Sequence, residues 1–377
     1  MPPALDKASV AAFIEAGSAD LDSFQPALER GIDLRARPVV LLGINGHFRD
    51  DFFARVVPQL NLVALIDNRL AGETMAGMTI ADDTGLQALA RKEPRLVTIN
   101  TGSSPYFYRL ADGFDLPCIS LLRAYDLLGL AQPMEMFEGL APDILDHFRD
   151  LLAFGDRLAD EASRQTLYRV MRYRLTHDLR ELQTINEPFD RQFYGNPFMA
   201  LRPDEVLLEG GAYDGDSIRH FLSHGGGRYG QIIAFEPEPA NFVRLSAFAA
   251  AQPNIRAVCK GLSNVNGTLR FSNGMGMASH VSADGEIEIA VCRIDDEVTE
   301  PVTLLKLDIE GAELDALDGA RETLRRNVPK LAVAVYHRPG DILAIPAFVE
   351  ALDRKQRLYL RHHTGFHYDT TFYSIPD

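Results

Sequence analysis

The chain has 377 residues, which is long for one domain and comfortable for two. Its hydrophobic fraction of 46% is typical of a soluble globular protein, and its formal net charge of −15 argues against duplex nucleic acid or an anionic membrane as the main partner. No apolar run approaches the roughly 18 residues of a membrane span and no cleavable signal pattern begins the chain, so we expect a cytoplasmic protein without membrane insertion.

The first 130 residues predict a domain of alternating strands and helices. Residues 1–35 carry helical apolar spacing in two short pieces, and residues 36–130 then alternate apolar strands with helical stretches, as in a parallel sheet with crossover helices. The run Gly43–His47 follows the first strand but lacks the third glycine of a dinucleotide fingerprint, and Asp67 ends the second strand, where it could bind a ribose. We therefore predict a degenerate Rossmann-like domain, with two roles open: a nucleotide or sugar-nucleotide site, and a scaffold, dimerisation or acceptor-docking surface.

Residues 131–200 predict a helical connector between two α/β domains. Phe137, Leu140, Ile144 and Phe148 recur at three- and four-residue spacing, and the charges that follow indicate a solvated outer face. The aromatic, glycine and proline residues of 189–203 predict a loop that leads into the next strand and could form one lip of the active site.

The C-terminal domain, expected over residues 201–377, begins with a strand that ends in an acid and a glycine-rich turn. Val206–Leu208 is apolar, Glu209 closes the run, and Gly210–Ser217 leads into an amphipathic stretch. Strand, glycine turn and helix start build the nucleotide pocket of doubly wound α/β domains, because glycine lets ligand and backbone approach closely. Glu209 and Asp214 would repel a pyrophosphate, whereas ribose hydroxyls, an ammonium and a sulfonium would be attracted. This charge pattern favours S-adenosylmethionine over a dinucleotide.

Two later turns extend this cofactor site. Glu236 ends the next predicted strand about 20 residues past the glycine turn, which is the spacing of an acid that binds ribose hydroxyls. Ser263 lies in the turn after the third strand, where the adenine would fall. The predicted cofactor-binding residues are Glu209, Gly211, Ala212, Tyr213, Asp214, Gly215, Ser217, Glu236, Ser263 and Asp308.

The remaining elements close the predicted sheet. Two extended segments, 268–271 and 286–292, frame the glycine-rich loop 272–280, which we expect to be mobile and to admit substrate; His280 lies in it. A strand with its helix start is expected over 302–313, with Asp308 and Glu310 alternating along the strand. A further strand at 330–336 is followed by His337, and the segments 357–361 and 370–375 predict an antiparallel pair.

The ordered motifs resemble the FkbM family of S-adenosylmethionine-dependent methyltransferases. They are the Glu209–Ser217 turn, Phe235-Glu236-Pro237, Arg293-Ile294-Asp295-Asp296, the run Lys306-Leu307-Asp308-Ile309-Glu310-Gly311-Ala312-Glu313, and Val335-Tyr336-His337. The resemblance covers roughly residues 193–375, and Glu209 stands where the family more often has aspartate. It implies a class I methyltransferase fold, Rossmann-like, for the C-terminal domain, and O-methylation of a hydroxyl, commonly on a sugar, glycan or polyketide-type product.

The reaction needs a group that removes the hydroxyl proton of the acceptor as the methyl group arrives. His337, at the end of a strand, is the first predicted catalytic residue because histidine ordinarily titrates near neutral pH. Asp308 is the alternative base, or it holds the methionine ammonium. With Glu310 and Glu313 these residues could also bind a divalent cation, although acids that satisfy free N–H groups at a helix start are the favoured interpretation. Lys306, Asp308 and Glu310 are expected to lie on one face of the strand, where Lys306 would form an ion pair that orients the two carboxylates.

Other residue groups leave alternatives open. Arg361, His362, His363 and His367 could contact an anionic acceptor or lie on a solvated hairpin. The three cysteines, which are odd in number and lack metal-type spacing, predict reduced, buried thiols. A homo-oligomer is compatible with the sequence. Competing functions are a nucleotide-sugar oxidoreductase or epimerase with two Rossmann domains, and a non-catalytic nucleotide-binding assembly module.

Overall fold

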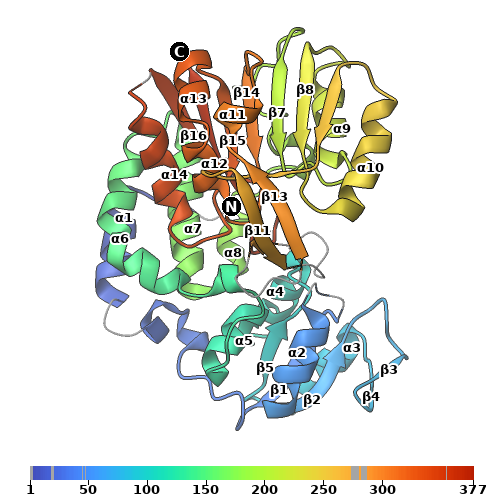
Figure 1. The fold of residues 1–377 in the computed structure, drawn as a ribbon. Helices are drawn as coiled ribbons and strands as arrows, with labels where there is room; N and C mark the ends of the chain where they lie inside the picture. The colour runs from blue at the N-terminus through green and yellow to red at the C-terminus, as the bar shows by residue number, and fades with distance from the viewer. Residues whose placement is uncertain are drawn as a thin grey trace. The chain divides into compact units, whose positions relative to one another are not determined.

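The computed structural model describes the chain except residues 1–2, 18–20, 45, 47, 273–279, 282–286 and 354. The chain divides into two compact units (Figure 1). Unit 1 comprises Met1–Ala153, Gln165–Asn186 and Thr364–His367, and unit 2 comprises Phe154–Arg164, Glu187–His363 and Tyr368–Asp377. None of the described helices combines the length and apolar composition needed to cross a bilayer.

Unit 1 is built on a parallel sheet, whose strands among the described residues follow the order β2-β1-β5-β6. The strands are β1 Pro38–Leu42, β2 Asn61–Ile66, β5 Val97–Asn100 and β6 Cys118–Ser120. All four residues of β5 and all three of β6 are buried, as expected for a parallel sheet covered on both faces. The helices between and after the strands are α2 Arg49–Arg55, α3 Asp83–Ala90, α4 Pro105–Asp112 and α5 Leu121–Leu128, and β3 Thr74–Met75 pairs with β4 Met78–Thr79.

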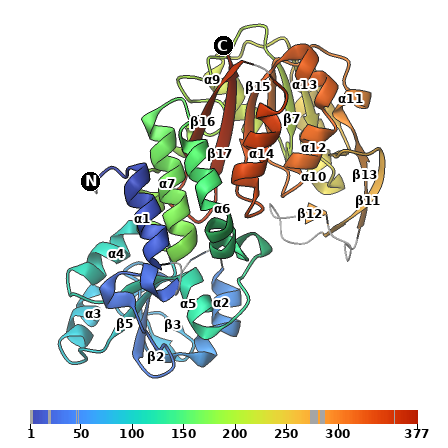
Figure 2. The same ribbon diagram turned by 90° about the vertical axis from the view of Figure 1, so that its left-hand side faces the viewer.

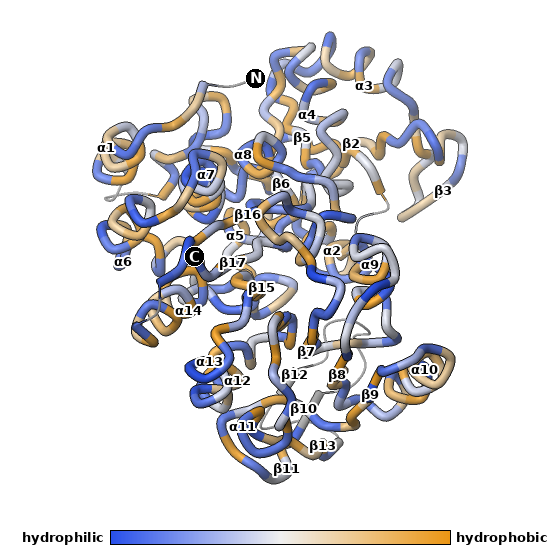
Figure 3. Tube along the Cα trace, turned by 90° about the horizontal axis from the view of Figure 1, so that it is seen from above, coloured by the Kyte–Doolittle hydropathy of each residue, from blue (hydrophilic) through white to orange (hydrophobic). Residues whose placement is uncertain are grey.

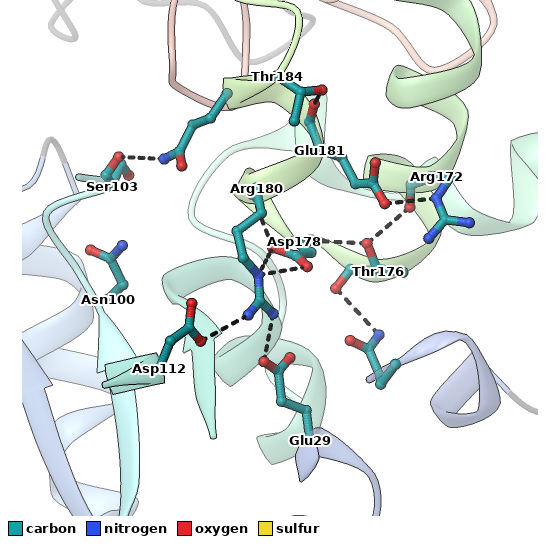
Figure 4. Close-up of polar contacts among 12 residues, drawn as sticks. Glu29, Asn100, Ser103, Asp112, Arg172, Thr176, Asp178, Arg180, Glu181 and Thr184 are labelled. Carbon is teal, nitrogen blue, oxygen red and sulfur yellow. Dashed lines mark hydrogen bonds and ion pairs between the residues drawn. The ribbon is translucent and has the colours of Figure 1, made fainter. Parts of the chain in front are cut away.

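Helices predicted for the connector are present, and a polar network anchors the last of them. These elements are α6 Leu140–Gly155, α7 Glu161–Thr176 and α8 Leu179–Gln183, and α1 Lys7–Gly17 lies near the N-terminus. Arg180 of α8 donates to Glu29 at 2.6 Å and to Asp178 at 2.8 Å (Figure 4). Burial raises the pKa of Glu29 to about 7, against the pull of Arg180. Arg180 therefore holds α8 to the N-terminal segment inside unit 1.

Unit 2 contains a larger sheet with the strand order β16-β17-β15-β14-β7-β8-β9 among the described residues. The strands are β7 Val206–Gly210, β8 Gln231–Phe235, β9 Ile255–Val258, β14 Leu304–Leu307, β15 Lys330–Ala334, β16 Gln356–His362 and β17 Thr370–Pro376. β17 runs antiparallel to both of its neighbours, and the other pairs are parallel. After a half-buried first residue, β7 and β8 bury the rest of their apolar side chains, and Figure 3 colours both strands as largely hydrophobic. The strand order reverses direction at β7 and β14, which makes their carboxyl ends the topological switch point.

Helices cover this sheet, and the segment between β9 and β14 forms a second sheet. The helices are α9 Asp216–His224, α10 Pro239–Ala250, α11 Ile294–Glu297, α12 Glu313–Asp318, α13 Arg321–Asn327 and α14 Asp341–Glu350; Figure 2 shows α12, α13 and α14 together on one side. The predicted extended segments form β11 Gly267–Ser272 and β13 Ile287–Cys292, which pair antiparallel, with β10 Gly261–Leu262 and β12 His280–Val281 at the edges. Most of the loop predicted to admit substrate lies outside the described residues, so its role stays a prediction.

Candidate active site

The glycine turn after β7 depends on two glycines in the left-handed region of backbone space. Gly211 has φ 73° and Gly215 has φ 90°. A Cβ on Gly211 would lie 1.9 Å from the backbone oxygen of Asp308, and one on Gly215 would lie 2.6 Å from Cδ1 of Phe248. The turn is therefore packed directly against the chain that follows β14, and any side chain at position 211 would push the two apart.

Glu236 closes this turn from the end of β8. Its Oε2 accepts the amide of Tyr213 at 2.9 Å, and its Oε1 accepts the amide of Glu238 at 3.0 Å. Burial raises the pKa of Glu236, while these two amides oppose the rise. A carboxylate can accept about four hydrogen bonds, so acceptor capacity remains for the ribose hydroxyls that the sequence predicts here.

Unit 1 repeats this arrangement after its own first two strands. Asp67, after β2, accepts the amide of Ile44 in the turn after β1 at 3.1 Å and the amide of Arg69, two residues on, at 2.9 Å. Asp67 is 7% exposed and Glu236 is 6% exposed. The two acids thus accept amides of their turns in the same way. The turn in unit 2 contains Gly210, Gly211 and Gly215, whereas the turn in unit 1 contains Gly43 and Gly46.

Glu209 does not face the site as a free acid. It is 0% exposed, and its Oε1 lies 2.9 Å from Nζ of Lys306 and accepts the hydroxyl of Ser217 at 2.6 Å. Its Oε2 accepts the hydroxyl of Tyr194. The protein itself engages both oxygens, so the predicted cofactor contact of Glu209 does not fit. Lys306 was expected to pair with Asp308 and Glu310 on its own strand, but it pairs with Glu209 of the neighbouring strand β7 and so supports the glycine turn.

The other predicted cofactor residues take different positions. Asp214 pairs with Arg219 at 3.1 Å and keeps part of its side chain exposed, whereas the Ser217 hydroxyl is turned toward Glu209. Ser263 follows β10, where its amide donates to the carbonyl of Cys292 at 3.0 Å. Tyr213 has φ 48°, another left-handed position in the turn. The contact of these residues and of Ala212 with a cofactor stays a prediction.

Acids and His337 converge at the ends of β14 and β15. His337 Nδ1 lies 2.9 Å from Oε1 of Glu313, while its Nε2 lies 3.6 Å from Oδ1 of Asp308 and 3.5 Å from Oε2 of Glu310. Tyr336, the residue before His337, donates its hydroxyl to Asp308 at 3.0 Å. The structure therefore brings both predicted catalytic residues, His337 and Asp308, to the same edge of the sheet.

The local backbone here differs from the prediction. The strand was expected to include Asp308 and Glu310, but β14 ends at Leu307 and Glu310 adopts φ 56°. A left-handed non-glycine residue is costly and clusters at functional sites. The acids reach His337 from a turn and not from one face of a strand.

The charge state of His337 also differs from the prediction. Burial alone would lower the pKa of His337, but the carboxylates of Glu313, Glu310 and Asp308 raise it to about 10. In the same cluster, burial together with neighbouring acids raises the pKa of Glu310 to about 8 and that of Asp341 to about 7. The near-neutral pKa expected for His337 is therefore wrong. A protonated imidazole cannot accept the acceptor's proton, so His337 acts in this state as a positive charge.

Other expectations for histidine and cysteine are corrected by burial. Arg361, His362 and His363 are buried, and Arg361 pairs with Asp160 at 2.6 Å, so these residues form neither a solvated hairpin nor an open anion site. All three cysteines are free; Cys118 and Cys292 are buried as predicted, whereas Cys259 is exposed.

Sequence reasoning missed two residues that shape the site. Tyr194 comes from the aromatic loop and is buried in the core of unit 2, where it donates to Glu209. Asp341 begins α14, and its Oδ2 accepts the amide of Arg338 just after His337. The aromatic composition of the loop was a signal for Tyr194, but no local pattern marks Asp341.

The fold of unit 2 and the residues at the carboxyl ends of its strands together define a Rossmann-like α/β domain of the methyltransferase class. Residues 209–364 match the Methyltransferase FkbM domain, which confirms the family resemblance of the sequence motifs.

A curated relative and a solved structure extend this result. The 2-O-methyltransferase NoeI of Sinorhizobium fredii (strain NBRC 101917 / NGR234) is 30% identical over 150 residues, which cover 33% of this chain; the match spans about 61% of the length of that relative. The crystal structure of the methyltransferase FkbM from Methylobacillus flagellatus KT is similar with a TM-score of 0.81 and 25% identity, covering 97% of this chain and 98% of that one. The structural likeness therefore extends beyond the matched domain into unit 1.

Proposed function

We propose that this chain transfers a methyl group from S-adenosylmethionine to a hydroxyl oxygen of a sugar, glycan or polyketide-type product. The observation that carries the proposal is the pairing of the glycine turn after β7 with Glu236 at the end of β8, at the switch point of the unit 2 sheet. The name of the relative NoeI, a 2-O-methyltransferase, supports oxygen as the methyl acceptor.

The residues present fit the methyl donor. Gly211 and Gly215 allow the left-handed backbone that shapes the turn, and Glu236 offers carboxylate lone pairs to ribose hydroxyls. Asp214, partly exposed on the same turn, supplies negative charge where a positively charged ligand would lie. S-adenosylmethionine supplies an activated methyl carbon: its bond to sulfur breaks as the bond to the acceptor oxygen forms.

Asp308 and His337 act on the acceptor in this proposal. β14 lies between β7 and β15 in the sheet, and Asp308 is the more exposed of the two residues. The acceptor hydroxyl loses its proton as the oxygen–carbon bond forms, and the products are a methyl ether, S-adenosylhomocysteine and the proton. His337→Ala should leave cofactor affinity near that of the wild type and lower turnover by about 10²-fold or more.

For unit 1, the repeated arrangement around Asp67 supports the nucleotide or sugar-nucleotide alternative. Titration with a nucleotide-sugar panel should show binding that Asp67→Asn weakens and Glu236→Ala leaves unchanged. Absence of nucleotide-sugar binding would favour the scaffold, dimerisation or docking role, and sedimentation analysis would then test for a homo-oligomer.

The decisive experiment is calorimetric titration of the purified chain with S-adenosylhomocysteine and, separately, with NAD. We expect micromolar binding of S-adenosylhomocysteine and none of NAD. Glu236→Ala should weaken that binding by about 2–4 kcal/mol, because charge-assisted hydrogen bonds to ribose are lost. Asp204→Asn, at an exposed acid before β7, is the matched control and should bind as the wild type does. Binding of NAD in place of S-adenosylhomocysteine would contradict the methyltransferase assignment and favour the oxidoreductase.

A further inference from the structure

We propose that Asp308, Glu313 and His337 form a binding site for a divalent metal ion of the Mn²⁺ type. The existence of the site is independent of the proposed function. Its role, to lower the pKa of the acceptor hydroxyl, rests on that function.

The spacing of the side chains suits an ion better than direct contact. One potential ligand atom from each of the three residues lies within 4.8 Å of the others. The 3.6 Å between His337 Nε2 and Asp308 Oδ1 exceeds the usual hydrogen-bond range of about 2.7–3.2 Å. Ligands held about 2.1 Å from a shared ion are separated by roughly 3–4 Å, and the 3.6 Å between these two atoms lies in that range.

Buried atoms without partners point to the same site. Among the described residues, Nε2 of His337 and Oε2 of Glu313 make no hydrogen bond, although the two residues are only 7% and 0% exposed. A buried polar atom without a partner is costly, and most such atoms in native proteins have one. A bound ion would supply the partner that the protein does not, and it would displace the proton that His337 carries in the metal-free chain, because a histidine ligand must be neutral.

The balance of charge favours a cation. Asp308, Glu310 and Glu313 surround the single imidazole of His337, and the buried Lys306 is paired with Glu209 at 2.9 Å. Carboxylates gathered in a poorly hydrated place repel one another unless a positive charge lies among them. A divalent cation bound among these carboxylates would offset that repulsion.

The simpler role of Glu313 explains only part of this geometry. Its Oε1 accepts the amide of Ile309 at 2.8 Å and contacts His337, as an acid at a helix start should. That role leaves Oε2 of Glu313 and Nε2 of His337 unexplained. Two carboxylates and one imidazole are ligands that Mn²⁺ accepts together, since carboxylates suit Mg²⁺ and Mn²⁺ while imidazole suits the transition metals.

The test is to titrate the metal-stripped full chain with Mn²⁺. Binding is measured by calorimetry and by the loss of the paramagnetic resonance signal of free Mn²⁺. No methyl donor or acceptor is added, so failure of the proposed function would not affect the result. We expect one site per chain, with affinity lowered at least tenfold by Asp308→Asn and by His337→Gln. Glu297→Gln, at an acid that pairs with Lys260 elsewhere in unit 2, is the control and should bind as the wild type does.

A second measurement guards against misfolded variants. Mn²⁺ should raise the unfolding temperature of the wild type and of Glu297→Gln, and should not raise that of Asp308→Asn. Absence of Mn²⁺ binding by the wild type, or equal binding by a folded Asp308→Asn variant, would overturn the proposal.

Discussion

Lys306→Met should destabilise unit 2 strongly, because Lys306 neutralises Glu209 inside the protein. Both side chains are buried, and Nζ of Lys306 also donates to the carbonyl oxygens of Gly210 at 3.3 Å and Gly211 at 3.1 Å. Methionine fills a similar volume but carries no charge and no donor. The substitution therefore leaves one carboxylate and two carbonyl oxygens of the glycine turn without their cation.

The size of the effect follows from the cost of an unpaired buried charge. Removing one partner of a buried ion pair costs about 3–5 kcal/mol. For a unit of roughly 200 residues, each kcal/mol lowers the unfolding temperature by about 2–4 °C. We therefore expect a fall of about 6–20 °C, with loss of S-adenosylhomocysteine binding because the turn loses its support.

The assay is unfolding in urea and by heat, followed by far-UV circular dichroism. Lys260→Met is the matched control: this lysine pairs with Glu297 at 2.6 Å on the surface, where an ion pair contributes about 0–1 kcal/mol. The double variant Glu209→Gln/Lys306→Met should recover much of the lost stability, since it removes the unpaired charge. A Lys306→Met variant as stable as Lys260→Met would refute the reasoning.

Three further outcomes test other parts of the structure. Gly211→Ala should lower the unfolding temperature and cofactor affinity, because a left-handed residue with a side chain costs about 1–2 kcal/mol and its Cβ would also clash with the backbone of Asp308. Gly226→Ala is the control, since Gly226 has φ 63° and its Cβ would meet no atom within 4 Å, so that only the backbone cost remains. Equal losses of stability in the two variants would contradict the packing at Gly211. Burial lowers the pKa of His363 to about 4, below the value near 6.5 in an unfolded chain, so its neutral ring stabilises the fold above pH 6.5 and that contribution, on the order of 3 kcal/mol, is lost as pH falls toward 4. Denaturant unfolding across this range should show a smaller decline for His363→Gln than for the wild type. Arg180→Met should destabilise unit 1 by about 2–4 kcal/mol by leaving Glu29 buried without its partner, and unchanged hydrogen-exchange protection of α8 would count against the network.

Much of the fold could be predicted from local patterns. The apolar runs of β7, β8 and β15 and the glycine turn after β7 have signatures that lie within a few residues. The acid that follows β8 was placed by its spacing from the turn, and the structure puts Glu236 on the amide of Tyr213 in that turn. The parallel sheet of unit 2 follows because strands that alternate with helices leave few other arrangements.

Roles that depend on burial could not be predicted in the same way. Arg361, His362 and His363 carry polar side chains, and a polar run usually indicates a solvated face. Their burial depends on residues such as Asp160 and Pro188, which are far away in the sequence. The local sequence around Arg361 therefore does not indicate which residues bury it.

The sequence by itself determined the strands, the turns and the kinds of chemical group at the strand ends, because hydrophobic periodicity and backbone preference act over a few residues. Only the tertiary structure decided what each group does there. Glu209 pairs with Lys306, 97 residues away in the sequence, and this ion pair supports the glycine turn. Glu313 contacts His337, 24 residues away, and with the neighbouring acids it raises the pKa of His337, so that the imidazole carries a positive charge. Charge state and exposure depend on the distances and burial of all surrounding groups, and those distances exist only in the folded chain.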